Sequence, residues 1–467
     1  MRVVVVGGGI TGLSTAYELV ATRDDVDVVL VEASERFGGK IRTQPFAGHP
    51  VDEAADAFLA RVPDAVDLCR RLGLDHDLVT PAARQAYLYS RGELRPFPEG
   101  VVLGVPTDLD ALAASGALSD AGVERARLDL TMGPDPARFG VDEPADESVG
   151  AVVRRRVGDE VFERLVAPLL SGVHAGDADR LSIAAGAPQL AAALRDHPSL
   201  VEGLRAQRAA GDPDAPVFYG LSHGTETLTT ALVDALRLAG ADLRHGNAVD
   251  RLEPTDGTGG YSLRLAGSGE RVDADAVILC SPLDATGRLL SSLAPDVATA
   301  MAEVAYADVA LVALAVPIDG IGRPLDGSGF LVAQPEGLLL TACSWASSKW
   351  AHLADPTVAL LRASVGRADD TRAAALSDAQ LVEAVRADLA TTMQLEAAPS
   401  EVRVTRWPRA LPQFEVGHLE RVRMWREALA DGHPRVLVAG AGFTGLGIPA
   451  CIGQGLAAAR AAAALVP

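Results

Sequence analysis

The chain has 467 residues, too many for one ordinary hydrophobic core, so we expect two or three domains. Hydrophobic residues make up 48% of it without a run of membrane-spanning length, which predicts a soluble protein with no stable membrane insertion. A net charge of −20 argues against nucleic acid as a partner. Four scattered cysteines argue against a disulfide framework and a metal site. With no signal-peptide pattern, we expect a cytoplasmic location.

A β-branched run, Val3–Val6, opens the chain and is typical of a buried strand. Gly7, Gly9 and Gly12 follow it at G-x-G-x-x-G spacing, ahead of a predicted helix over 13–20. The first glycine permits a tight turn, the second lets the backbone approach a pyrophosphate, and the third lets the helix pack closely on the strand. The helix N-terminus offers free N–H groups to the phosphates.

A second predicted strand, Val28–Val31, ends at Glu32, twenty residues after Gly12. This is the spacing of a carboxylate that accepts hydrogen bonds from a ribose 2′-OH. The sequence therefore predicts a bound adenine dinucleotide, and these two features alone fit NAD as well as FAD.

Two further glycine-rich stretches favour a flavin. Residues 38–43 (GGKIRT) place glycines beside cations, which suits a loop that passes close to a flavin or its phosphates. Residues 440–447 (GAGFTGLG) connect a predicted strand over 435–439 to a predicted helix over 451–465. A nucleotide domain built from separated segments is an arrangement that flavoproteins use.

The predicted fold is α/β, with a Rossmann-like FAD-binding domain assembled from three segments and a mixed-sheet substrate domain that carries a helical insertion. The expected bounds are 1–65, 217–288 and 429–467 for the FAD-binding domain, 66–88, 182–216 and 289–428 for the substrate domain, and 89–181 for the helical insertion.

The glycine fingerprint, Glu32, residues 38–43 and residues 439–442 (AGAG) together resemble the FAD-binding motifs of the flavin-containing amine oxidase superfamily. Other stretches resemble the porphyrinogen oxidases of that superfamily, in the same order along nearly the whole chain. They are 154–160 (RRRVGDE), 167–177 (APLLSGVHAGD), 181–182 (LS), 329–332 (GFLV), 347–350 (SSKW), 416–418 (VGH) and 445–455 (GLGIPACIGQG).

The resemblance is greatest to the soluble bacterial branch. It implies FAD-dependent oxidation of coproporphyrinogen III to coproporphyrin III in haem biosynthesis, with two electrons removed in each of three flavin cycles and O2 reduced to hydrogen peroxide. It also implies that flavin N5 accepts the hydride, and we predict no acid or base residue. A transient contact with a downstream haem-pathway enzyme is a further expectation.

By the same resemblance we predict which residues hold the cofactor. They are Gly7, Gly9, Ile10, Thr11, Gly12, Glu32, Ala33, Gly38, Gly39, Lys40, Arg42, Val249, Gly442, Ile448, Pro449 and Ala450. The chain departs from the superfamily pattern at Lys40, where arginine is common, and at Ala54-Ala55, where relatives usually have Gly-Pro. Near the second departure, Asp52 and Glu53 are either active-site acids or residues of a structural turn.

The four carboxylates of the implied substrate call for cationic or hydrogen-bonding partners. Arg84, Arg91 and Arg95 form a local positive excess in an acidic chain, and we predict that they bind propionates. Solvated surface arginines are the alternative. His174, between two glycines, either faces the tetrapyrrole or packs inside the protein.

Three other functions remain open. Protoporphyrinogen IX is a possible alternative substrate that the sequence does not exclude. An amine oxidase is less favoured, because Lys40 and Lys349 are the only lysines and aromatic residues make up only 4% of the chain. A flavin- or NAD-binding protein without catalysis is the third alternative.

Overall fold

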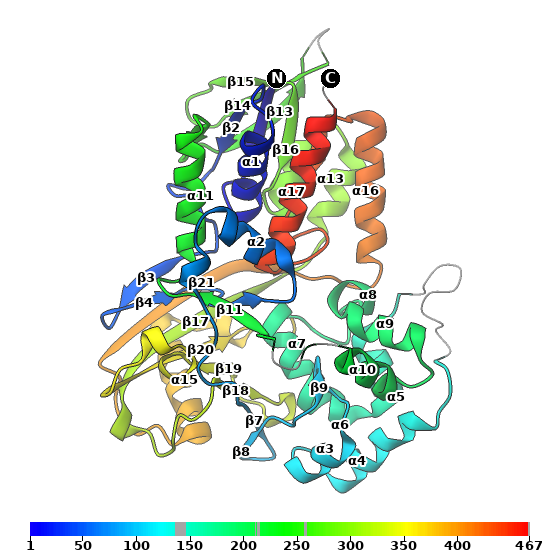
Figure 1. The fold of residues 1–467 in the computed structure, drawn as a ribbon, viewed down its shortest axis with the longest axis vertical. Coiled ribbons are helices and arrows are strands. Elements are labelled where there is room, and N and C mark those ends of the chain that lie inside the picture. The colour runs from blue at the N-terminus through cyan, green and yellow to red at the C-terminus, as the bar shows by residue number, and fades with distance from the viewer. Residues whose placement is uncertain (136–145, 211, 213–214, 256–258, 466–467) are drawn as a thin grey trace. The chain divides into compact units, whose positions relative to one another are not determined.

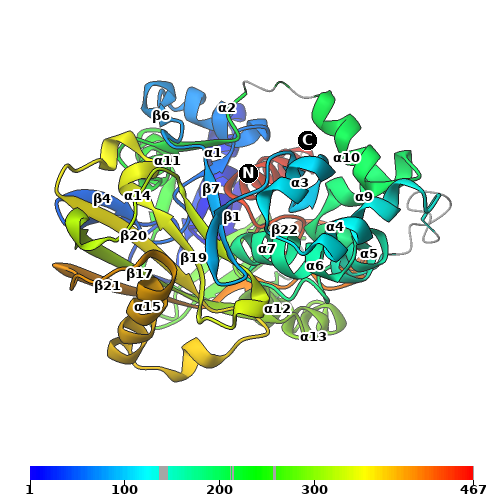
Figure 2. The same ribbon diagram turned by 90° about the horizontal axis from the view of Figure 1, so that it is seen from below.

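The computed structural model of the chain describes residues 1–135, 146–210, 212, 215–255 and 259–465 (Figures 1 and 2). The chain forms two compact units. Unit 1 comprises Met1–Thr80, Pro216–Ala305 and Leu419–Pro467, and unit 2 comprises Pro81–Ala215 and Tyr306–His418.

Unit 1 contains an α/β sheet, smaller sheets and several long helices. Its strands are β1 (Arg2–Val6), β2 (Asp27–Val31), β3 (Thr43–Phe46), β4 (His49–Asp52), β5 (Phe58–Leu59), β6 (Leu78–Val79), β11 (Phe218–Leu221), β12 (Asp242–Arg244), β13 (Val249–Pro254), β14 (Tyr261–Leu265), β15 (Arg271–Ala274), β16 (Ala276–Leu279) and β22 (Val436–Val438). Its helices are α1 (Ile10–Thr22), α2 (Pro63–Arg71), α11 (Glu226–Leu238), α12 (Leu283–Leu290), α13 (Pro295–Ala302), α16 (His418–Gly432) and α17 (Ile448–Ala464).

The main sheet of unit 1 has the strand order β12-β2-β1-β16-β22, and all its pairs are parallel. Its valine-rich central strands are buried, as expected for a parallel sheet covered on both faces. Helices α1 and α17 follow β1 and β22 and lie side by side (Figure 1). The sheet therefore delivers the glycine turns after β1 and β22 to the same edge, at the carboxyl ends of parallel strands.

Unit 1 extends beyond the bounds expected for the nucleotide domain. Residues 66–80 belong to it because Leu68 and Cys69 of α2 join its hydrophobic core and Arg71 pairs with Glu18 of α1. Residues 289–305 and 419–428 also belong to it. The sequence pattern does not show these tertiary contacts.

Unit 2 combines a large sheet with a group of helices. Its strands are β7 (Ala86–Ser90), β8 (Glu93–Pro96), β9 (Val101–Val102), β10 (Val105–Pro106), β17 (Tyr306–Pro317), β18 (Gly329–Val332), β19 (Leu340–Trp345), β20 (Val358–Val365) and β21 (Glu401–Pro412). Its helices are α3 (Leu109–Ser115), α4 (Asp120–Arg127), α5 (Val149–Val157), α6 (Asp159–Val161), α7 (Ala167–His174), α8 (Ile183–Gly186), α9 (Pro188–Asp196), α10 (Leu200–Ala209), α14 (Ala346–Lys349) and α15 (Asp378–Met393).

The seven-stranded sheet of unit 2 is mixed, with the order β21-β17-β20-β19-β18-β7-β8. Only the β18–β7 pair is parallel among its described pairs. Helix α15 packs on one face of this sheet and buries a hydrophobic core there (Figure 2). The expected helical insertion over 89–181 is not a separate unit, because β8 adds to the sheet through β7.

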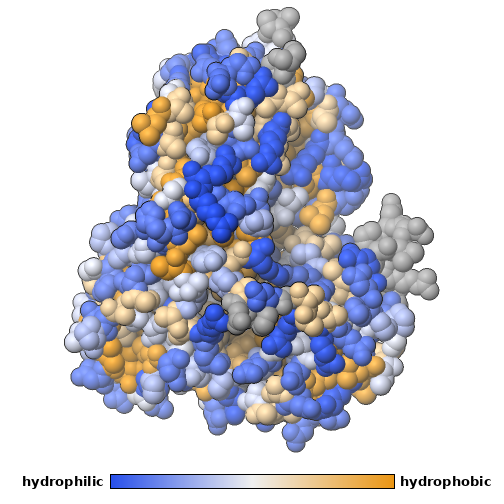
Figure 3. Space-filling model, in the orientation of Figure 1, coloured by the Kyte–Doolittle hydropathy of each residue, from blue (hydrophilic) through white to orange (hydrophobic). Residues whose placement is uncertain are grey.

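The surface in Figure 3 is largely hydrophilic, with hydrophobic residues in small groups. Among the described residues, no helix has both the length and the hydropathy needed to cross a membrane.

Candidate cofactor-binding site

The glycine turn after β1 is fixed by contacts that leave no room for side chains. Gly7 has a φ of +107° and its N–H donates to the carbonyl of Val31 at 2.8 Å. A Cβ at Gly7 would lie 2.9 Å from the carbonyl carbon of Cys280, and a Cβ at Gly12 would overlap the carbonyl oxygen of Gly7. Both positions therefore require glycine for the turn itself.

Gly9 differs from its two neighbours in the motif. It has ordinary backbone angles, φ −73° and ψ −178°, and a Cβ placed on it would have no described atom within 4 Å. It is the N-cap of α1 and supplies no side-chain acceptor to the first turn of the helix. The space beside Gly9 and the N–H groups of this first turn suit an anionic ligand such as a pyrophosphate, with Ile10 and Thr11 in the same turn.

The Glu32 carboxylate is held at the end of β2. It accepts hydrogen bonds from the Gly8 N–H at 2.6 Å and from the N–H and hydroxyl of Ser34. The Asn247 N–H donates to the Glu32 carbonyl, which brings the start of β13, at Val249, beside this turn. Ala33 is exposed next to it. The structure thus gathers Glu32, Ala33 and Val249 in one region of unit 1.

The loop after Glu32 returns to the first glycine turn. The Gly38 N–H donates to the Gly8 carbonyl at 2.8 Å, and Gly39 has a φ of +58°. A Cβ on Gly39 would lie 3.2 Å from the Cα of Gly9. These contacts bring the two glycine motifs together and explain the absence of larger side chains.

The two cations of this loop have different surroundings. Arg42 pairs with the buried carboxylate of Glu53, with Nε and Oε2 3.0 Å apart. Lys40 is exposed, and partial desolvation by the neighbouring protein lowers the pKa of its ammonium group. Arg42 is thereby oriented by Glu53, and Lys40 lies within electrostatic reach of Cys451 at the start of α17.

The C-terminal glycine turn leads into α17, whose N-cap, Gly447, again supplies no side-chain acceptor. Ile448, Pro449 and Ala450 form the first turn of this helix. A Cβ at Gly442 would meet the side chain of Leu283, so this position is also closely packed.

Gly455 allows α17 to approach α1, since a Cβ there would lie 2.6 Å from the Thr11 carbonyl oxygen. Gly455 is seven residues after the start of α17, whereas Thr11 is one residue after the start of α1. At 1.5 Å per residue, the N-terminus of α17 extends about 9 Å past that of α1. Two uncapped helix N-termini, offset along their axes, suit a long phosphate-containing cofactor.

An α/β unit with this turn and this carboxylate defines a dinucleotide-binding protein. Residues 10–463 match the family described as flavin containing amine oxidoreductase, and the chain belongs to that family. Its cofactor is therefore a flavin, and the protein is a flavin-dependent oxidoreductase.

The similarity to known proteins extends over nearly the whole chain. The coproporphyrinogen III oxidase of Bacillus subtilis is 38% identical, over 98% of this chain and 97% of the relative. That of Mycobacterium tuberculosis is 39% identical, over 99% of this chain and 96% of the relative. A solved structure from Exiguobacterium, provisionally named protoporphyrinogen oxidase, has a TM-score of 0.86 at 32% identity and covers 98% of both chains. Cyclohexylamine oxidase from Brevibacterium oxydans shares the fold, with a TM-score of 0.70 at 18% identity, 100% of this chain and 99% of that one being covered.

The predicted substrate arginines lie in unit 2. Arg84 is exposed in the segment before β7. Arg91 is in the β7–β8 turn and donates from its guanidinium to the Leu118 carbonyl at 2.9 Å. Arg95, on β8, pairs with Glu93 at 2.7 Å. The structure brings Arg91 and Arg95 into one hairpin, and propionate binding by all three arginines remains a prediction.

His174 is buried at the end of α7. Its Nε2 lies 3.2 Å from the Gly186 carbonyl and its ring is 6.3 Å from that of Phe414. Burial lowers the pKa of His174 to about 4, so the imidazole is neutral at neutral pH. These contacts favour a packing role for His174 over a position facing the tetrapyrrole. The neighbouring residue, Val173, is 54% exposed.

Asp52 makes several hydrogen bonds within unit 1. Its Oδ1 accepts hydrogen bonds from the hydroxyl of Thr43 and from the N–H and hydroxyl of Thr225. Asp52 therefore joins the β3–β4 hairpin to the start of α11. The neighbouring carboxylate, Glu53, orients Arg42 as described above.

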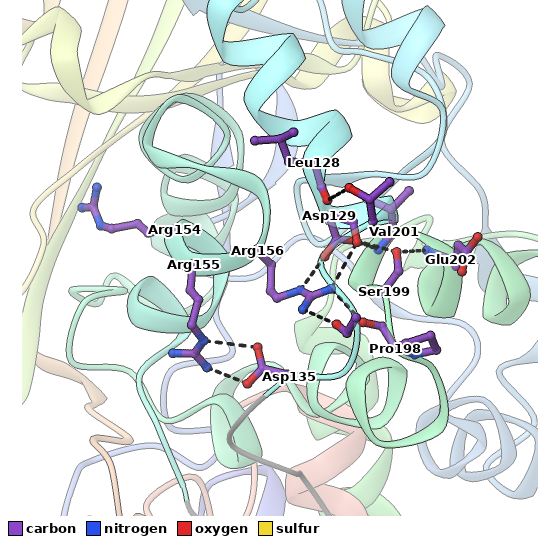
Figure 4. A network of polar contacts seen from close by, with 12 residues as sticks. Leu128, Asp129, Asp135, Arg154, Arg155, Arg156, Pro198, Ser199, Val201 and Glu202 are labelled. Carbon is purple, nitrogen blue, oxygen red and sulfur yellow. Dashed lines mark hydrogen bonds and ion pairs between the residues drawn. The ribbon is translucent and has the colours of Figure 1, made fainter.

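Three consecutive arginines on α5, labelled in Figure 4, have partners that no sequence motif indicates. Arg154 pairs with Asp159, Glu163 and Asp179, and Arg155 with Asp135 and Glu147.

Arg156 is 1% exposed and pairs with the fully buried Asp129 at 2.5 Å. The second oxygen of Asp129 accepts hydrogen bonds from Ser199 and from the N–H of Val201. Because the three side chains diverge around the helix, each stabilises a different part of unit 2.

Proposed function

We propose that this protein oxidises coproporphyrinogen III to coproporphyrin III with FAD as cofactor and O2 as electron acceptor, releasing hydrogen peroxide. The observation that supports this most is the full-length similarity to bacterial proteins named coproporphyrinogen III oxidase. Those of Bacillus subtilis, Mycobacterium tuberculosis and Staphylococcus aureus are 32–39% identical to this chain. The removal of six electrons requires three successive flavin cycles.

FAD, rather than a shorter flavin, suits the geometry of unit 1. In this assignment the first turn of α1 and Gly9 bind the pyrophosphate, and Glu32 accepts hydrogen bonds from the adenosine ribose. The N-terminus of α17, about 9 Å farther along by helix rise, lies toward the flavin end together with Lys40. The bound flavin supplies a hydride acceptor at N5.

The remaining contribution of the chain is to orient the substrate and exclude water. A porphyrinogen meso carbon lies between two pyrroles, so departure of a hydride leaves a cation delocalised over both rings. This stabilisation is intrinsic to the substrate, and the reaction depends chiefly on holding the C–H bond in position. We therefore assign no residue as an acid or base.

Protoporphyrinogen IX oxidation is the second candidate. It is favoured by the Exiguobacterium structure and by a 29% identical Arabidopsis thaliana relative named protoporphyrinogen oxidase. An amine oxidase has less support. Lys349 is the only lysine besides Lys40, and it lies over the Trp350 ring in unit 2. We further propose that the protein acts in the cytoplasm and passes its porphyrin to the next haem-pathway enzyme.

The test is to supply the purified yellow protein with coproporphyrinogen III and protoporphyrinogen IX side by side, in air. Porphyrin fluorescence and peroxide are both measured. The proposal predicts faster porphyrin formation from coproporphyrinogen III, with three peroxides for each porphyrin. If a flavin-loaded protein forms porphyrin from neither coproporphyrinogen III nor protoporphyrinogen IX, the proposal is contradicted.

A further inference from the structure

The carboxylate of Glu32 has most of its acceptor sites filled by the protein. Its Oε2 accepts a hydrogen bond from the Gly8 N–H at 2.6 Å. Its Oε1 accepts two, from the Ser34 N–H at 2.8 Å and from the Ser34 hydroxyl at 2.7 Å. A carboxylate offers about four lone-pair sites, so these donors leave about one for a ligand. A ribose that donates from both its 2′-OH and its 3′-OH needs one more site.

The Ser34 hydroxyl has a second acceptor within reach. Its Oγ lies 2.8 Å from the carbonyl oxygen of Arg36. Because a hydroxyl carries a single proton, Ser34 donates either to Glu32 or to Arg36 at any one time. The change requires only a rotation of the O–H group about the Cβ–Oγ bond. It frees the missing site on Glu32 and leaves the Ser34 proton hydrogen-bonded.

Backbone contacts hold both acceptors in place. The Asn247 N–H donates to the Glu32 carbonyl at 2.9 Å, and the Gly246 N–H donates to the Ser34 carbonyl at 2.7 Å. Residues 32–34 therefore stay beside the segment that follows β12. Arg36 is held by its own guanidinium, which donates to two carbonyls of the following glycine loop at 2.7 and 2.8 Å. The Ser34 hydroxyl thus lies between two oxygens that are both fixed.

We propose that Ser34 is a positioning residue for the cofactor, and that its hydroxyl proton moves from Glu32 to the Arg36 carbonyl when the adenosine ribose binds. The inference rests on the proposed assignment of FAD, with its ribose on Glu32. Without the ribose, the Ser34 hydroxyl holds the Glu32 carboxylate in one orientation. With the ribose bound, the sugar hydroxyls take the freed site, and no donor is left without a partner.

This arrangement lowers the entropy cost of binding. A glutamate side chain loses rotamer freedom when a ligand fixes it. Ser34 imposes that order before the cofactor arrives, so less of the cost falls on the binding step. Its effect should be confined to the adenosine half of FAD, because riboflavin has no group that would reach Glu32 in this assignment.

The experiment compares the flavin-free forms of the wild type, Ser34→Ala and Ser34→Thr. Ser34 is exposed, so its replacement by alanine leaves no buried cavity. The matched control is Ser291→Ala, because Ser291 is also an exposed serine of unit 1 whose hydroxyl donates to a backbone carbonyl. Titrations with FAD and with riboflavin give the two values of Kd. Competition of AMP and of 2′-deoxy-AMP against FAD measures recognition of the ribose hydroxyl.

We expect Ser34→Ala to raise the Kd for FAD about three- to tenfold and to leave the Kd for riboflavin within about twofold of the wild type. The preference for AMP over 2′-deoxy-AMP should fall at least about twofold, since Glu32 is less well oriented. Ser34→Thr keeps the hydroxyl and should restore both values. The Ser291→Ala control should match the wild type.

Two results would overturn the inference. One is an unchanged Kd for FAD in Ser34→Ala, together with an unchanged preference for AMP. The other is an equal loss of affinity for FAD and riboflavin with that preference intact, which would mean that Ser34 only stabilises the fold. Tm is recorded for every variant to identify such a loss.

A failure of the underlying assignment would be visible in the wild type. If the wild-type protein binds riboflavin as tightly as FAD, or does not distinguish AMP from 2′-deoxy-AMP, Glu32 does not bind the ribose and the proposed cofactor geometry is contradicted. A failure of the Ser34 inference is instead seen as a variant that behaves like a wild type with normal ribose recognition. The two outcomes are therefore distinguishable.

Discussion

Gly9 and Gly12 occupy the same sequence motif but have different physical constraints. A Cβ at Gly12 overlaps the Gly7 carbonyl oxygen, whereas a Cβ at Gly9 points into open space. We predict that Gly12→Ala prevents stable folding of unit 1. Gly9→Ala should leave the Tm of the flavin-free protein within about 2 °C of wild type and weaken flavin binding at least about tenfold.

Flavin titration of the two apoproteins, with thermal unfolding in parallel, checks this prediction. Wild-type affinity in Gly9→Ala would mean that the pyrophosphate lies elsewhere. A stable Gly12→Ala protein would show that the turn is less constrained than its contacts indicate.

His174 makes the stability of unit 2 depend on pH. Burial lowers the pKa of its imidazole to about 4 in the folded state, from about 6.5 when exposed. The unfolded chain therefore binds a proton below about pH 6.5 that the folded chain does not bind until about pH 4. The free energy of unfolding should fall by about 3 kcal/mol as the pH drops through this window, and the full contribution is present above it.

Denaturant unfolding of the wild type and of His174→Gln, at intervals from pH 7.5 to 4, measures this effect. Glutamine retains an N–H for the Gly186 carbonyl but does not titrate in this range. The variant should show a shallower decline of stability with falling pH. Parallel curves for the two proteins would show that other groups cause the decline.

At the scale of elements, α5 shows what three adjacent like charges can do in an acidic chain. A helix directs consecutive side chains about 100° apart, so Arg154, Arg155 and Arg156 meet three separate groups of carboxylates. Figure 4 shows the contacts of Arg155 with Asp135 and of Arg156 with Asp129. Asp179, Asp135 and Asp129 lie 20 to 27 residues away from their arginines in the sequence, so the motif alone did not reveal these contacts.

Of these ion pairs, the buried Arg156–Asp129 pair should lower the free energy of unfolding most when one of its two residues is replaced. Asp129→Ala leaves a buried guanidinium without its carboxylate and should lower the free energy of unfolding by about 3–5 kcal/mol. Glu383→Ala, which breaks an exposed pair on α15, should cost less than about 1 kcal/mol. Denaturant unfolding compares the two.

The double variant Asp129→Leu/Arg156→Met provides the control for this argument. Apolar side chains at both positions remove the uncompensated charge, and stability should recover in part. A double variant as unstable as Asp129→Ala would show that the hydrogen bonds to Ser199 and Val201, rather than the ion pair, dominate.

Elements with strong local patterns were predictable from the sequence. The buried valine runs indicated β1 and β2, and the glycine spacing indicated the turn before α1. The hairpin β7–β8 was not expected as part of the large sheet, because its pairing with β18 joins residues more than 230 positions apart. Sheet register of that kind is a tertiary property.

The same limit applies to the site. Motif spacing indicated the glycines and Glu32, whose roles depend on local turns. It did not indicate that Glu53 orients Arg42 or that Asp52 joins a hairpin to a helix. Those assignments depend on contacts between side chains of different elements, which motif spacing does not show.

At the scale of the whole molecule, similarity along its full length supports one flavin-dependent oxidation. The most direct measurement is the ratio of kcat/KM for coproporphyrinogen III to that for protoporphyrinogen IX, in the same flavin-loaded preparation. We predict a ratio of about ten or more, corresponding to about 1.4 kcal/mol of preferential transition-state binding. A ratio below one would contradict the proposed substrate.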